Sequence, residues 1–260
     1  MPSPIPQTPA SLYDEITALY YRTTSGRGHR PTNKHYETAA NLLRRRLGPW
    51  MPRQKNSRCL DLACGCEEMI YCLEREGFQN TVGVDLCREE IEQGQPFVKS
   101  ELVHADVVDY LRQSRSESFD FISAFNFLEH LPKEAARDVL TESRRVLRPG
   151  GTLVAMVPNA ISPFSGTTRY WDITHEWAFS PNNFRQLAAL VGFDPEVEFR
   201  ECGPVPHGVV SGIRFLLWRV IRLGIAGWLL VELADHKGGV YTMDMLVRLR
   251  VPRSTEDHRQ

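Results

Sequence analysis

Residues 59–77, CLDLACGCEEMIYCLEREG, combine a strand signal, a tight turn and a helix signal. The run Cys59–Leu62 is apolar apart from one aspartate, and the small residues Ala63 and Gly65 follow it. A glycine at such a turn lets the backbone approach a ligand without a Cβ in the way. A helix beginning near Cys66 would direct its N–H groups and positive dipole end at that ligand. The stretch therefore predicts a nucleotide-binding loop after a first strand, although a purely structural turn has the same pattern.

The acidic residues of this loop limit the kind of cofactor that it can bind. Glu67 stands where a dinucleotide fold would place its third glycine, and a carboxylate there would repel a pyrophosphate. NAD and FAD are therefore disfavoured, whereas a cofactor that carries positive charge would be tolerated.

Outward from this loop, strand and helix signals alternate along the chain. Short β-rich runs occur at residues 58–63, 81–86, 97–105, 118–125, 151–158, 195–202 and 241–251. Helical patterns occur at residues 11–23, 33–47, 66–76, 88–94, 107–114, 133–147 and 181–191. This alternation is typical of a parallel, doubly wound sheet, in which ligands bind outside the carboxyl ends of the strands.

Composition and charge exclude some classes of protein. The chain has 260 residues, of which 42% are hydrophobic and 24% charged, enough for one sizeable globular domain with additional segments. Its formal net charge of −1 gives no basic field for nucleic acid. The N-terminal sequence MPSPIPQTPASLYDE lacks a basic segment followed by an apolar one, so we expect a cytoplasmic protein. Its six cysteines then read as reduced thiols, and their spacing predicts no metal site.

Further polar residues end the next predicted strands at even spacing. Asp85 ends the second strand, where a carboxylate can accept both hydroxyls of a ribose. Asp106 follows the third strand and could accept from an adenine amino group, with the Val107 N–H facing the ring. Asn126 ends the fourth strand. A cap on the helix that begins at Val107 is the structural alternative for Asp106, but the order and spacing together favour a nucleoside site.

The segment from Cys59 to Asn159 resembles the class I S-adenosylmethionine-dependent methyltransferases. The motifs that carry the resemblance are LDLACGCEE, VGVDL, HADV, FDFISAFNFLEHL and LRPGGTLVAMVPN. The resemblance implies a Rossmann-like three-layer α/β sandwich with a seven-stranded, mostly parallel sheet, whose antiparallel last strand would be YTMDMLVRLRV. It implies S-adenosyl-L-methionine as the cofactor. The cofactor-binding residues are then Asp61, Ala63, Gly65, Asp85, Leu86, Asp106, Val107 and Asn126. Ala63 and Glu67 depart from glycines of the family's first motif.

The same patterns divide the chain into segments. Residues 1–10 are predicted to be disordered, and residues 11–50 to form an N-terminal helical cap. Residues 51–253 form the methyltransferase domain, followed by a tail at 254–260. Within the domain, 160–180 is an acceptor loop and 206–238 an amphipathic helical insertion.

Two histidines are candidates for a general base. Positioning supplies most of the help in methyl transfer, about 7–11 kcal/mol, and a base adds about 10²- to 10⁴-fold. His130 lies in NFLEHLP and His175 in RYWDITHEWAFSP. We favour His175, which Asp172 could orient as the acid of a catalytic triad does. The structural alternatives are a turn-capping role for His175 and a packed helix-entry role for His130.

Neighbouring side chains indicate the acceptor. Tyr170 and Trp171 could stack on a sugar or another ring, and Glu129 could hydrogen-bond an acceptor hydroxyl. The D-x-T-H arrangement from Asp172 to His175 is similar to bacterial methyltransferases of surface-glycan and sugar biosynthesis. We therefore predict O-methylation of a sugar or glycan-like hydroxyl.

Other functions stay open at this point. They are O- or N-methylation of a small secondary metabolite, a non-catalytic scaffold with the methyltransferase fold, and an NAD-dependent oxidoreductase. No metal is predicted, although Asp172, His175 and Glu176 could hold a divalent ion.

The most apolar stretch of the chain covers residues 209–233, VVSGIRFLLWRVIRLGIAGWLLVEL. Three arginines interrupt it, so a membrane span is not expected. At about 100° per residue, Arg214, Arg219 and Arg222 fall in one arc opposite an apolar side, which predicts a basic amphipathic helix. That apolar side is made by Ile213, Leu216, Leu217, Val220 and Leu223. The helix could contact the inner membrane face, form a homodimer contact or lid, or pack on the domain's own core.

Overall fold

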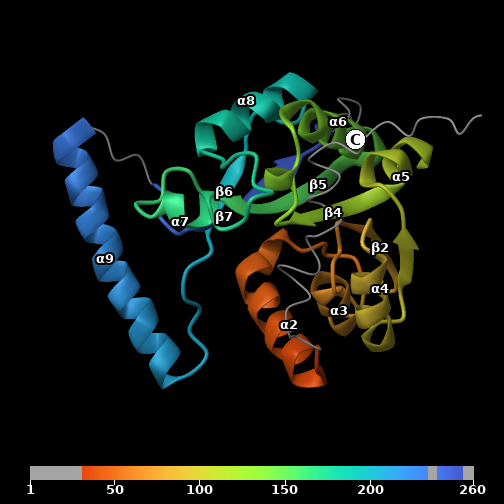
Figure 1. Cartoon of the computed structure of the whole chain (residues 1–260), viewed down its shortest axis with the longest axis horizontal. Coiled ribbons are helices and arrows are strands. Elements are labelled where there is room, and N and C mark those ends of the chain that lie inside the picture. Colours follow the sequence, from red (N-terminus) through yellow and green to blue (C-terminus); the bar gives the residue numbers. More distant parts are fainter. Residues whose placement is uncertain (1–30, 234–238, 254–260) are drawn as a thin grey trace, which may run out of the picture.

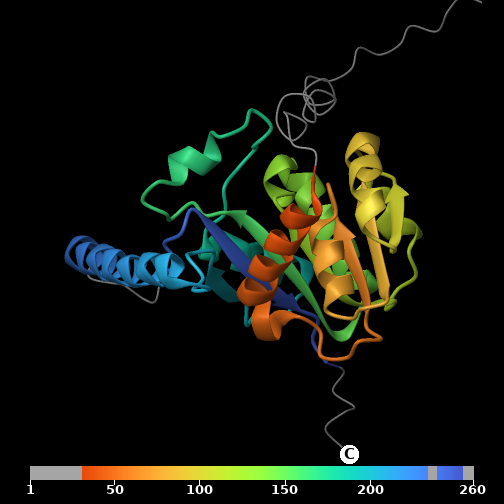
Figure 2. The same ribbon diagram turned by 90° about the horizontal axis from the view of Figure 1, so that it is seen from below.

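The computed structural model describes residues 31–233 and 239–253. The predicted disordered segment 1–10, the predicted helix 11–23 and the predicted tail 254–260 lie outside the described residues, as do residues 234–238 of the predicted insertion. Within the described ranges, helices cover both faces of a central sheet (Figures 1 and 2). This arrangement confirms the predicted three-layer α/β fold.

The central sheet has seven strands in the order β3-β2-β1-β4-β5-β7-β6. The strands are β1 (Arg58–Leu62), β2 (Asn80–Asp85), β3 (Glu101–His104), β4 (Phe119–Phe125), β5 (Leu147–Pro158), β6 (Glu198–Glu201) and β7 (Asp244–Arg250). Strands β1 to β5 are parallel, whereas β7 runs antiparallel to both of its neighbours, as predicted. The strand order reverses between β1 and β4, so a ligand site is expected at the carboxyl ends of these two strands.

The described helices match the sequence patterns with small shifts at their ends. They are α2 (Asn33–Leu47), α3 (Glu68–Arg75), α4 (Arg88–Gly94), α5 (Val107–Gln113), α6 (Lys133–Val146), α7 (Ser165–Arg169), α8 (Pro181–Val191) and α9 (Val209–Leu233), with 3-10 turns η2 (Gly48–Trp50), η3 (Gln95–Phe97) and η4 (Leu128–His130). Helix α7, within the predicted acceptor loop, was not expected. Strand β5 begins at Leu147 rather than at residue 151, because Leu147 pairs with Phe119 before a register shift.

Alternating side chains of the strands belong to two apolar clusters on opposite faces of the sheet. On β1, Leu60 and Leu62 belong to the larger cluster, with residues of α5, α6 and α8. Cys59 belongs to a second cluster with Met69 and Leu73 of α3 and with Trp50 after α2. Because successive strand residues point to opposite faces, burial on both faces fixes the register of the strands. The strand ends that carry the predicted site residues are therefore held in place.

Helix α9 stands away from the sheet in both ribbon views (Figures 1 and 2). Its less exposed residues form a narrow stripe that includes Ser211, Phe215, Trp218, Arg222, Ile225 and Leu229, and Trp218 and Arg222 of this stripe contact the body. Trp218 Nε1 donates to Glu201 Oε2 at 3.0 Å, and Arg222 Nε lies 3.2 Å from Glu201 Oε1. Arg222 therefore faces the body and lies between Arg214 and Arg219 on the helical projection, so the predicted arc of three arginines is centred on the side of α9 that meets the body.

The apolar side predicted for this helix is exposed to solvent. Ile213 is 53% exposed, Leu216 65% and Leu223 73%, so this side does not pack on the domain's own core. None of the helices within the described ranges is both long and apolar enough to cross a bilayer.

Candidate active site

The loop after β1 has the predicted tight turn, built from three left-handed residues. Ala63, Gly65 and Glu67 have φ angles of 51°, 54° and 63°. Only one of them is a glycine, so the other two hold a backbone conformation that L residues rarely adopt. Helix α3 consequently begins at Glu68, two residues later than predicted. Such strain in a loop at the carboxyl end of a central strand is typical of ligand-binding turns.

Asp85, at the end of β2, ties this loop to the neighbouring strand. Its Oδ2 accepts from the Gly65 N–H at 2.8 Å, and its Oδ1 accepts from the Cys87 N–H at 2.7 Å. The carboxylate is 7% exposed, and burial raises its pKa although these backbone hydrogen bonds act in the opposite direction. Two predicted cofactor residues, Gly65 and Asp85, are thus in direct contact.

Asp61 is a buried carboxylate beside this loop. It is 3% exposed and accepts from the Ser123 hydroxyl at 2.5 Å. Burial, followed by the charges of Glu68 and Asp85, raises the pKa of Asp61 to about 7 against the effect of the Ser123 hydrogen bond. A positively charged ligand would offset this excess of negative charge, so the site fits a cofactor with cationic groups.

Glu67 does not lie as predicted. Its side chain is fully buried and occupies the space beside Gly94, where an added Cβ would lie 1.0 Å from Glu67 Oε2. Neither carboxyl oxygen has a hydrogen-bond partner in the described part of the chain. Burial raises the pKa of Glu67 to about 10, so the group is neutral near pH 7. The predicted repulsion of a pyrophosphate by Glu67 is therefore wrong, and Asp61 is the buried acid that favours a cation.

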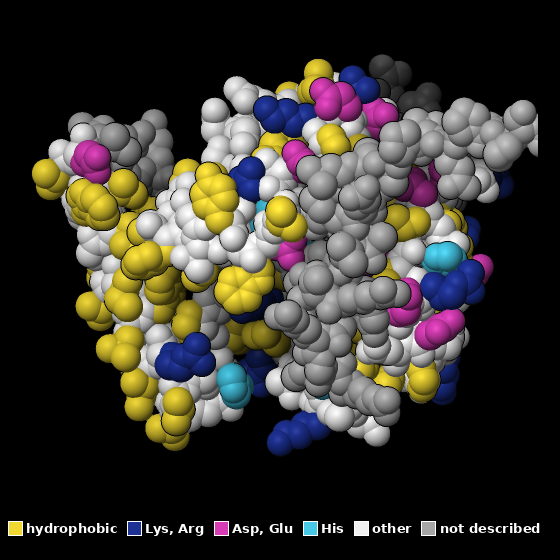
Figure 3. Space-filling model, viewed as in Figure 1, with side chains coloured by type: hydrophobic (Ala, Val, Ile, Leu, Met, Phe, Trp, Pro, Cys, Tyr) yellow, Lys and Arg dark blue, Asp and Glu magenta, His cyan; other side chains and the backbone are white. Residues whose placement is uncertain are grey.

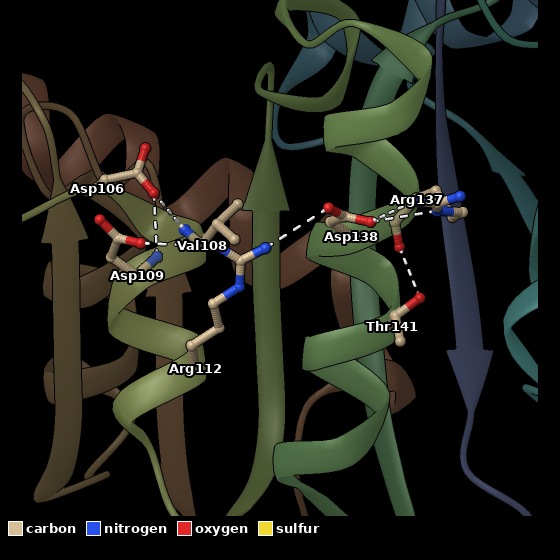
Figure 4. A network of polar contacts seen from close by, with 7 residues as sticks. All are labelled: Asp106, Val108, Asp109, Arg112, Arg137, Asp138 and Thr141. Carbon is tan, nitrogen blue, oxygen red and sulfur yellow. Dashed lines mark hydrogen bonds and ion pairs between the residues drawn. The ribbon is translucent and has the colours of Figure 1, made fainter.

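Asp106 caps helix α5. Its Oδ1 accepts from the N–H groups of Val108 at 2.8 Å and Asp109 at 3.0 Å (Figure 4). The other oxygen, Oδ2, makes no hydrogen bond to residues 31–233 or 239–253. The capping role considered as the structural alternative is therefore present, and it leaves one oxygen for the predicted adenine contact. Figure 4 also shows the ion pair between Arg112 and Asp138, 3.6 Å apart, which links α5 to α6.

The remaining predicted cofactor residues lie at the same end of the sheet. Leu86 directly follows Asp85 and is 55% exposed, and its carbonyl oxygen lies 3.0 Å from His104 Nε2. Asn126 follows β4 with a left-handed φ of 49°, and its N–H donates to Met156 O at 2.9 Å. Val107 begins α5 and is buried. All three follow the carboxyl ends of parallel strands, as the sequence pattern predicts.

The two candidate bases lie against each other. The ring centroids of His130 and His175 are 4.7 Å apart in an edge-to-face arrangement. His130 belongs to η4 after β4, and His175 belongs to the segment between β5 and α8. These two segments are joined by the Glu176 N–H, which donates to Glu129 O at 2.8 Å. The sequence predicted both residues as candidates but not that they form a pair.

The hydrogen bonds around the pair differ from the predicted triad. Asp172 Oδ1 accepts from the Thr174 hydroxyl at 2.6 Å, and Thr174 Oγ1 lies 2.6 Å from His130 Nδ1. The chain of contacts from the Asp172 side chain therefore leads through Thr174 to His130, whereas the predicted role was to orient His175. His175 Nδ1 instead lies 2.8 Å from the carbonyl oxygen of Thr168.

These contacts set the protonation of the rings. Because a carbonyl oxygen only accepts, Nδ1 of His175 carries the proton in the neutral ring and Nε2 carries the lone pair. Burial, followed by the proximity of His175, lowers the pKa of His130 to about 4, although Asp172 and the Asn126 backbone act in the opposite direction. Neutral His130 therefore adds no positive charge beside the His175 ring.

Glu129 is buried next to the histidines, whereas the aromatic residues predicted for the acceptor lie outside. Glu129 is 1% exposed, its Oε2 has no partner among the described residues, and burial raises its pKa to about 8. Tyr170 and Trp171 are 80% and 74% exposed. Sequence reasoning did not single out Thr168 or Arg169, which hold the segment in place. Arg169 donates to the carbonyl oxygens of His175 and Glu176, contacts that no local pattern reveals.

Two surface hollows lie at the opposite end of the sheet. One, of 570 Å³, is lined by Arg58, Ser118 and Arg148 among others. The other, of 990 Å³, is lined by Trp50, Asp120 and Arg250 among others. Neither contains a residue of the predicted site, and both surround the amino ends of the parallel strands, where this fold does not bind its ligands.

Comparisons with known proteins agree with this geometry. A family model described as a methyltransferase domain matches residues 32–197. A SAM-dependent methyltransferase from Archaeoglobus fulgidus is similar over 91% of this chain and 100% of its own, with 21% identity and a TM-score of 0.62. Phosphoethanolamine N-methyltransferase 2 of Haemonchus contortus, in complex with S-adenosyl-L-methionine, is similar over 92% of this chain and 60% of its own, with 14% identity and a TM-score of 0.57.

A third structure contains a methyltransferase of Haloferax volcanii with its Trm112 activator. It is similar over 92% of this chain and 94% of its own, with 15% identity and a TM-score of 0.58. No curated protein sequence gives a significant match. At these identities the structures establish the fold, and the family model covers more than half of the chain.

Proposed function

This chain belongs to the methyltransferase domain family and is a class I S-adenosylmethionine-dependent methyltransferase, and from this premise we propose that it methylates a hydroxyl oxygen of a sugar or glycan-like acceptor. The observation that carries the proposal is the histidine pair at the carboxyl end of β4. A hydroxyl acceptor loses a proton as the methyl group arrives, and Nε2 of His175 can take that proton.

The residues at the strand ends are suited to hold the cofactor. We assign Asp61 to its cationic methionine part, Asp85 to the ribose hydroxyls, and Asp106 with Val107 to the adenine. S-adenosylmethionine supplies the activated methyl group when it is bound. The chain's own contribution is to hold the acceptor oxygen in line with that group, where positioning supplies about 7–11 kcal/mol.

When the Nε2 lone pair of His175 is not bound to any ion, His175 acts as the base. Its Nδ1–H is held by the Thr168 carbonyl oxygen at 2.8 Å, which keeps Nε2 unprotonated and fixes the ring. After proton transfer, the imidazolium keeps its bond to Thr168. The exposed rings of Tyr170 and Trp171 offer apolar faces on which a sugar ring can stack.

A small-molecule acceptor is the alternative within the same enzyme class. One protein of the same fold is a phosphoethanolamine N-methyltransferase, so methylation at nitrogen is included. The alternatives differ at the base, because an unprotonated amine needs no base to react, whereas a hydroxyl does. Incubating pools of sugar nucleotides, and separately of small amines, with radiolabelled S-adenosylmethionine identifies the acceptor class.

The His175→Ala substitution tests the base. We expect turnover on the identified acceptor to fall about 10²- to 10⁴-fold, while the affinity for S-adenosylmethionine stays within error. The control is His207→Ala, which removes an exposed histidine whose Nδ1 lies 2.9 Å from Val205 O. Equal turnover in His175→Ala and wild type at every pH would contradict the assignment.

We also propose that α9 lies on the surface of an anionic membrane, which would place the site near a lipid-linked acceptor. The side of α9 away from the body is formed by exposed apolar residues, namely Val209, Val210, Ile213, Leu216, Leu217, Val220, Ile221, Leu223, Trp228, Leu230 and Val231. Figure 3 shows these hydrophobic side chains along the helix.

The charges of α9 support the same placement. On the helical projection at about 100° per residue, Arg214 and Arg219 lie on either side of the exposed apolar face. Glu232 is the one acidic residue in the α9 sequence. This is the geometry of a helix in the plane of a membrane, with apolar side chains in the interface and arginines at anionic headgroups. A homodimer through this face is the competing outcome.

A further inference from the structure

The side chains of Glu129, His130 and His175 form a cluster of possible metal ligands beside the proposed acceptor site. Each offers one ligand atom, and these atoms all lie within 4.8 Å of one another. Glu129 and His130 come from η4, and His175 comes from the segment before α8. We propose that these three residues bind a divalent transition-metal ion, which makes the site a metal centre.

A second observation at this place is an oxygen of the Glu129 carboxyl group that has no partner within the part of the chain that the structure describes. It is 1% exposed, and its Oε2 has no hydrogen-bond partner among the described residues. Buried polar oxygens without a partner are rare in folded proteins, and a bound cation satisfies such an oxygen as well as a hydrogen-bond donor does. A cation between Glu129 and the histidines would give this oxygen a partner.

The contacts behind the histidines have the pattern of a metal site. Ligating histidines usually hydrogen-bond a carbonyl, hydroxyl or carboxylate oxygen through the ring nitrogen that does not bind the metal. His175 Nδ1 meets the Thr168 carbonyl oxygen at 2.8 Å, so its Nε2 lone pair is available to an ion. His130 Nδ1 meets Thr174 Oγ1 at 2.6 Å, and Thr174 is held by Asp172.

The ligand set selects the class of ion. Two imidazoles and one carboxylate suit Zn²⁺ or Co²⁺, whereas Mg²⁺ and Ca²⁺ prefer oxygen ligands throughout. The metal ligands considered in the sequence analysis were Asp172, His175 and Glu176. In the structure, Asp172 Oδ1 accepts from the Thr174 hydroxyl, and Glu176 is exposed. Glu129 and His130 take their places.

Three protein ligands leave open positions on the ion, where an acceptor hydroxyl could bind and lose its proton more easily. That role rests on the proposed function, whereas metal binding does not. An ion and the general-base role would use the same lone pair of His175, so in the ion-bound protein the ion, rather than His175, would activate the hydroxyl.

The test is titration of the full-length protein with Co²⁺, followed by its visible absorption, and with Zn²⁺ in competition. Neither cofactor nor acceptor is added, so a failure of methyl transfer does not affect the readout. We expect saturable binding at one site, weakened about tenfold or more by Glu129→Gln and by His175→Ala. His207→Ala is the matched histidine control and should bind like wild type. Mg²⁺ in excess should not compete.

Two measurements keep the result interpretable. Affinity of each variant for S-adenosylmethionine, which depends on the strand ends rather than on this cluster, checks that the fold is intact. Intense thiolate-to-cobalt absorption would show binding at cysteines instead, which would overturn the proposal. Absence of binding to the wild type, or equal binding by wild type, Glu129→Gln and His175→Ala, would overturn it as well. Metal binding without methyl transfer to any hydroxyl would contradict only the proposed function.

Discussion

At the scale of single residues, the strand-end acids were predictable and their partners were not. Asp61 lies next to the last residue of β1, Asp85 ends β2, and Asp106 follows β3. The apolar runs define these strands, and parallel strands bring their carboxyl ends to one edge. The orientation of Glu67 depends on the space left by Gly94 on another helix. The contact from Asp172 depends on the path of the segment before α8. Neither has a local sequence signal.

Replacing Asp85 by alanine should weaken S-adenosylmethionine binding by about 1.5–3 kcal/mol, because a hydrogen-bonding charged group is lost. The Gly65 N–H, which bonds Asp85 at 2.8 Å, also loses its partner, so the loop contributes to the loss. Calorimetry measures the affinity. Asp109→Ala removes a nearby exposed acid and should bind normally; unchanged affinity in Asp85→Ala would place the ribose elsewhere.

Cofactor binding should depend on pH through Asp61. Burial raises its pKa to about 7 in the free protein, and a bound ammonium group favours the ionised form, which lowers that pKa. Below pH 7, binding must therefore release a proton, and the affinity should fall by up to about tenfold per pH unit towards pH 5.5.

Calorimetry at pH 6 in two buffers of different ionisation enthalpy measures this proton release. Asp61→Asn has no proton to release and should bind more weakly with a flat pH dependence between pH 5.5 and 7. Wild-type affinity that stays constant over the same range would show that Asp61 does not meet the positive charge.

At the scale of helices and strands, the apolar periodicities predicted the order and type of the elements and missed their ends. Strand β5 begins at Leu147, the last residue of the helical pattern predicted at 133–147, because β4 offers a pairing partner there. Helix α3 begins late because the left-handed Glu67 precedes it. Both boundaries are decided by contacts with a second element, which a one-dimensional pattern does not contain.

The fit between Glu67 and α4 makes Gly94 a sensitive position. A Cβ there would meet Glu67 Oε2 at 1.0 Å and the Cys66 carbonyl oxygen at 2.9 Å, so Gly94→Ala must displace the loop. We expect a loss of about 1–3 kcal/mol in the free energy of unfolding, as for overpacked cores, measured by chemical denaturation.

The control for this substitution is Gly224→Ala in α9. Among the described residues, no atom outside the neighbouring backbone of α9 lies within 4 Å of the added Cβ, and a helical glycine replaced by alanine gains up to about 1 kcal/mol. A Gly94→Ala protein that unfolded at the wild-type midpoint would contradict the close packing of Glu67 against α4.

At the scale of the whole molecule, the three layers and the antiparallel last strand were predictable, but the placement of α9 was not. The sequence shows an amphipathic helix with three arginines in one arc. In the structure Arg222 joins the contact with the body through Glu201, while the apolar side points outward. The side of a helix that faces the body is the side that finds a partner there. The partner of Arg222 is Glu201, which lies 21 residues earlier in the sequence, so the pattern of the helix alone does not reveal the contact.

The outward side of α9 should bring the protein to anionic vesicles. We expect the wild type to float with phosphatidylglycerol-rich liposomes, less at high salt, and to stay soluble with neutral ones. Leu217→Glu places a charge on the exposed apolar face and should reduce flotation. Leu190→Glu changes an equally exposed leucine on α8 and should not. Wild-type protein that remains with the soluble fraction would remove the membrane proposal and leave a homodimer to be measured by sedimentation.

The hydrogen bond between Asp85 and the Gly65 amide also bears on how fast and how tightly a nucleoside can be captured. This bond and the three left-handed residues around it hold the turn in place in the structure, which contains no small molecule. Little affinity is then lost to ordering the backbone on binding. In the proposed site, each Asp85 oxygen already accepts one backbone N–H and keeps a second lone pair for a ribose hydroxyl, so the ribose would join contacts that already exist.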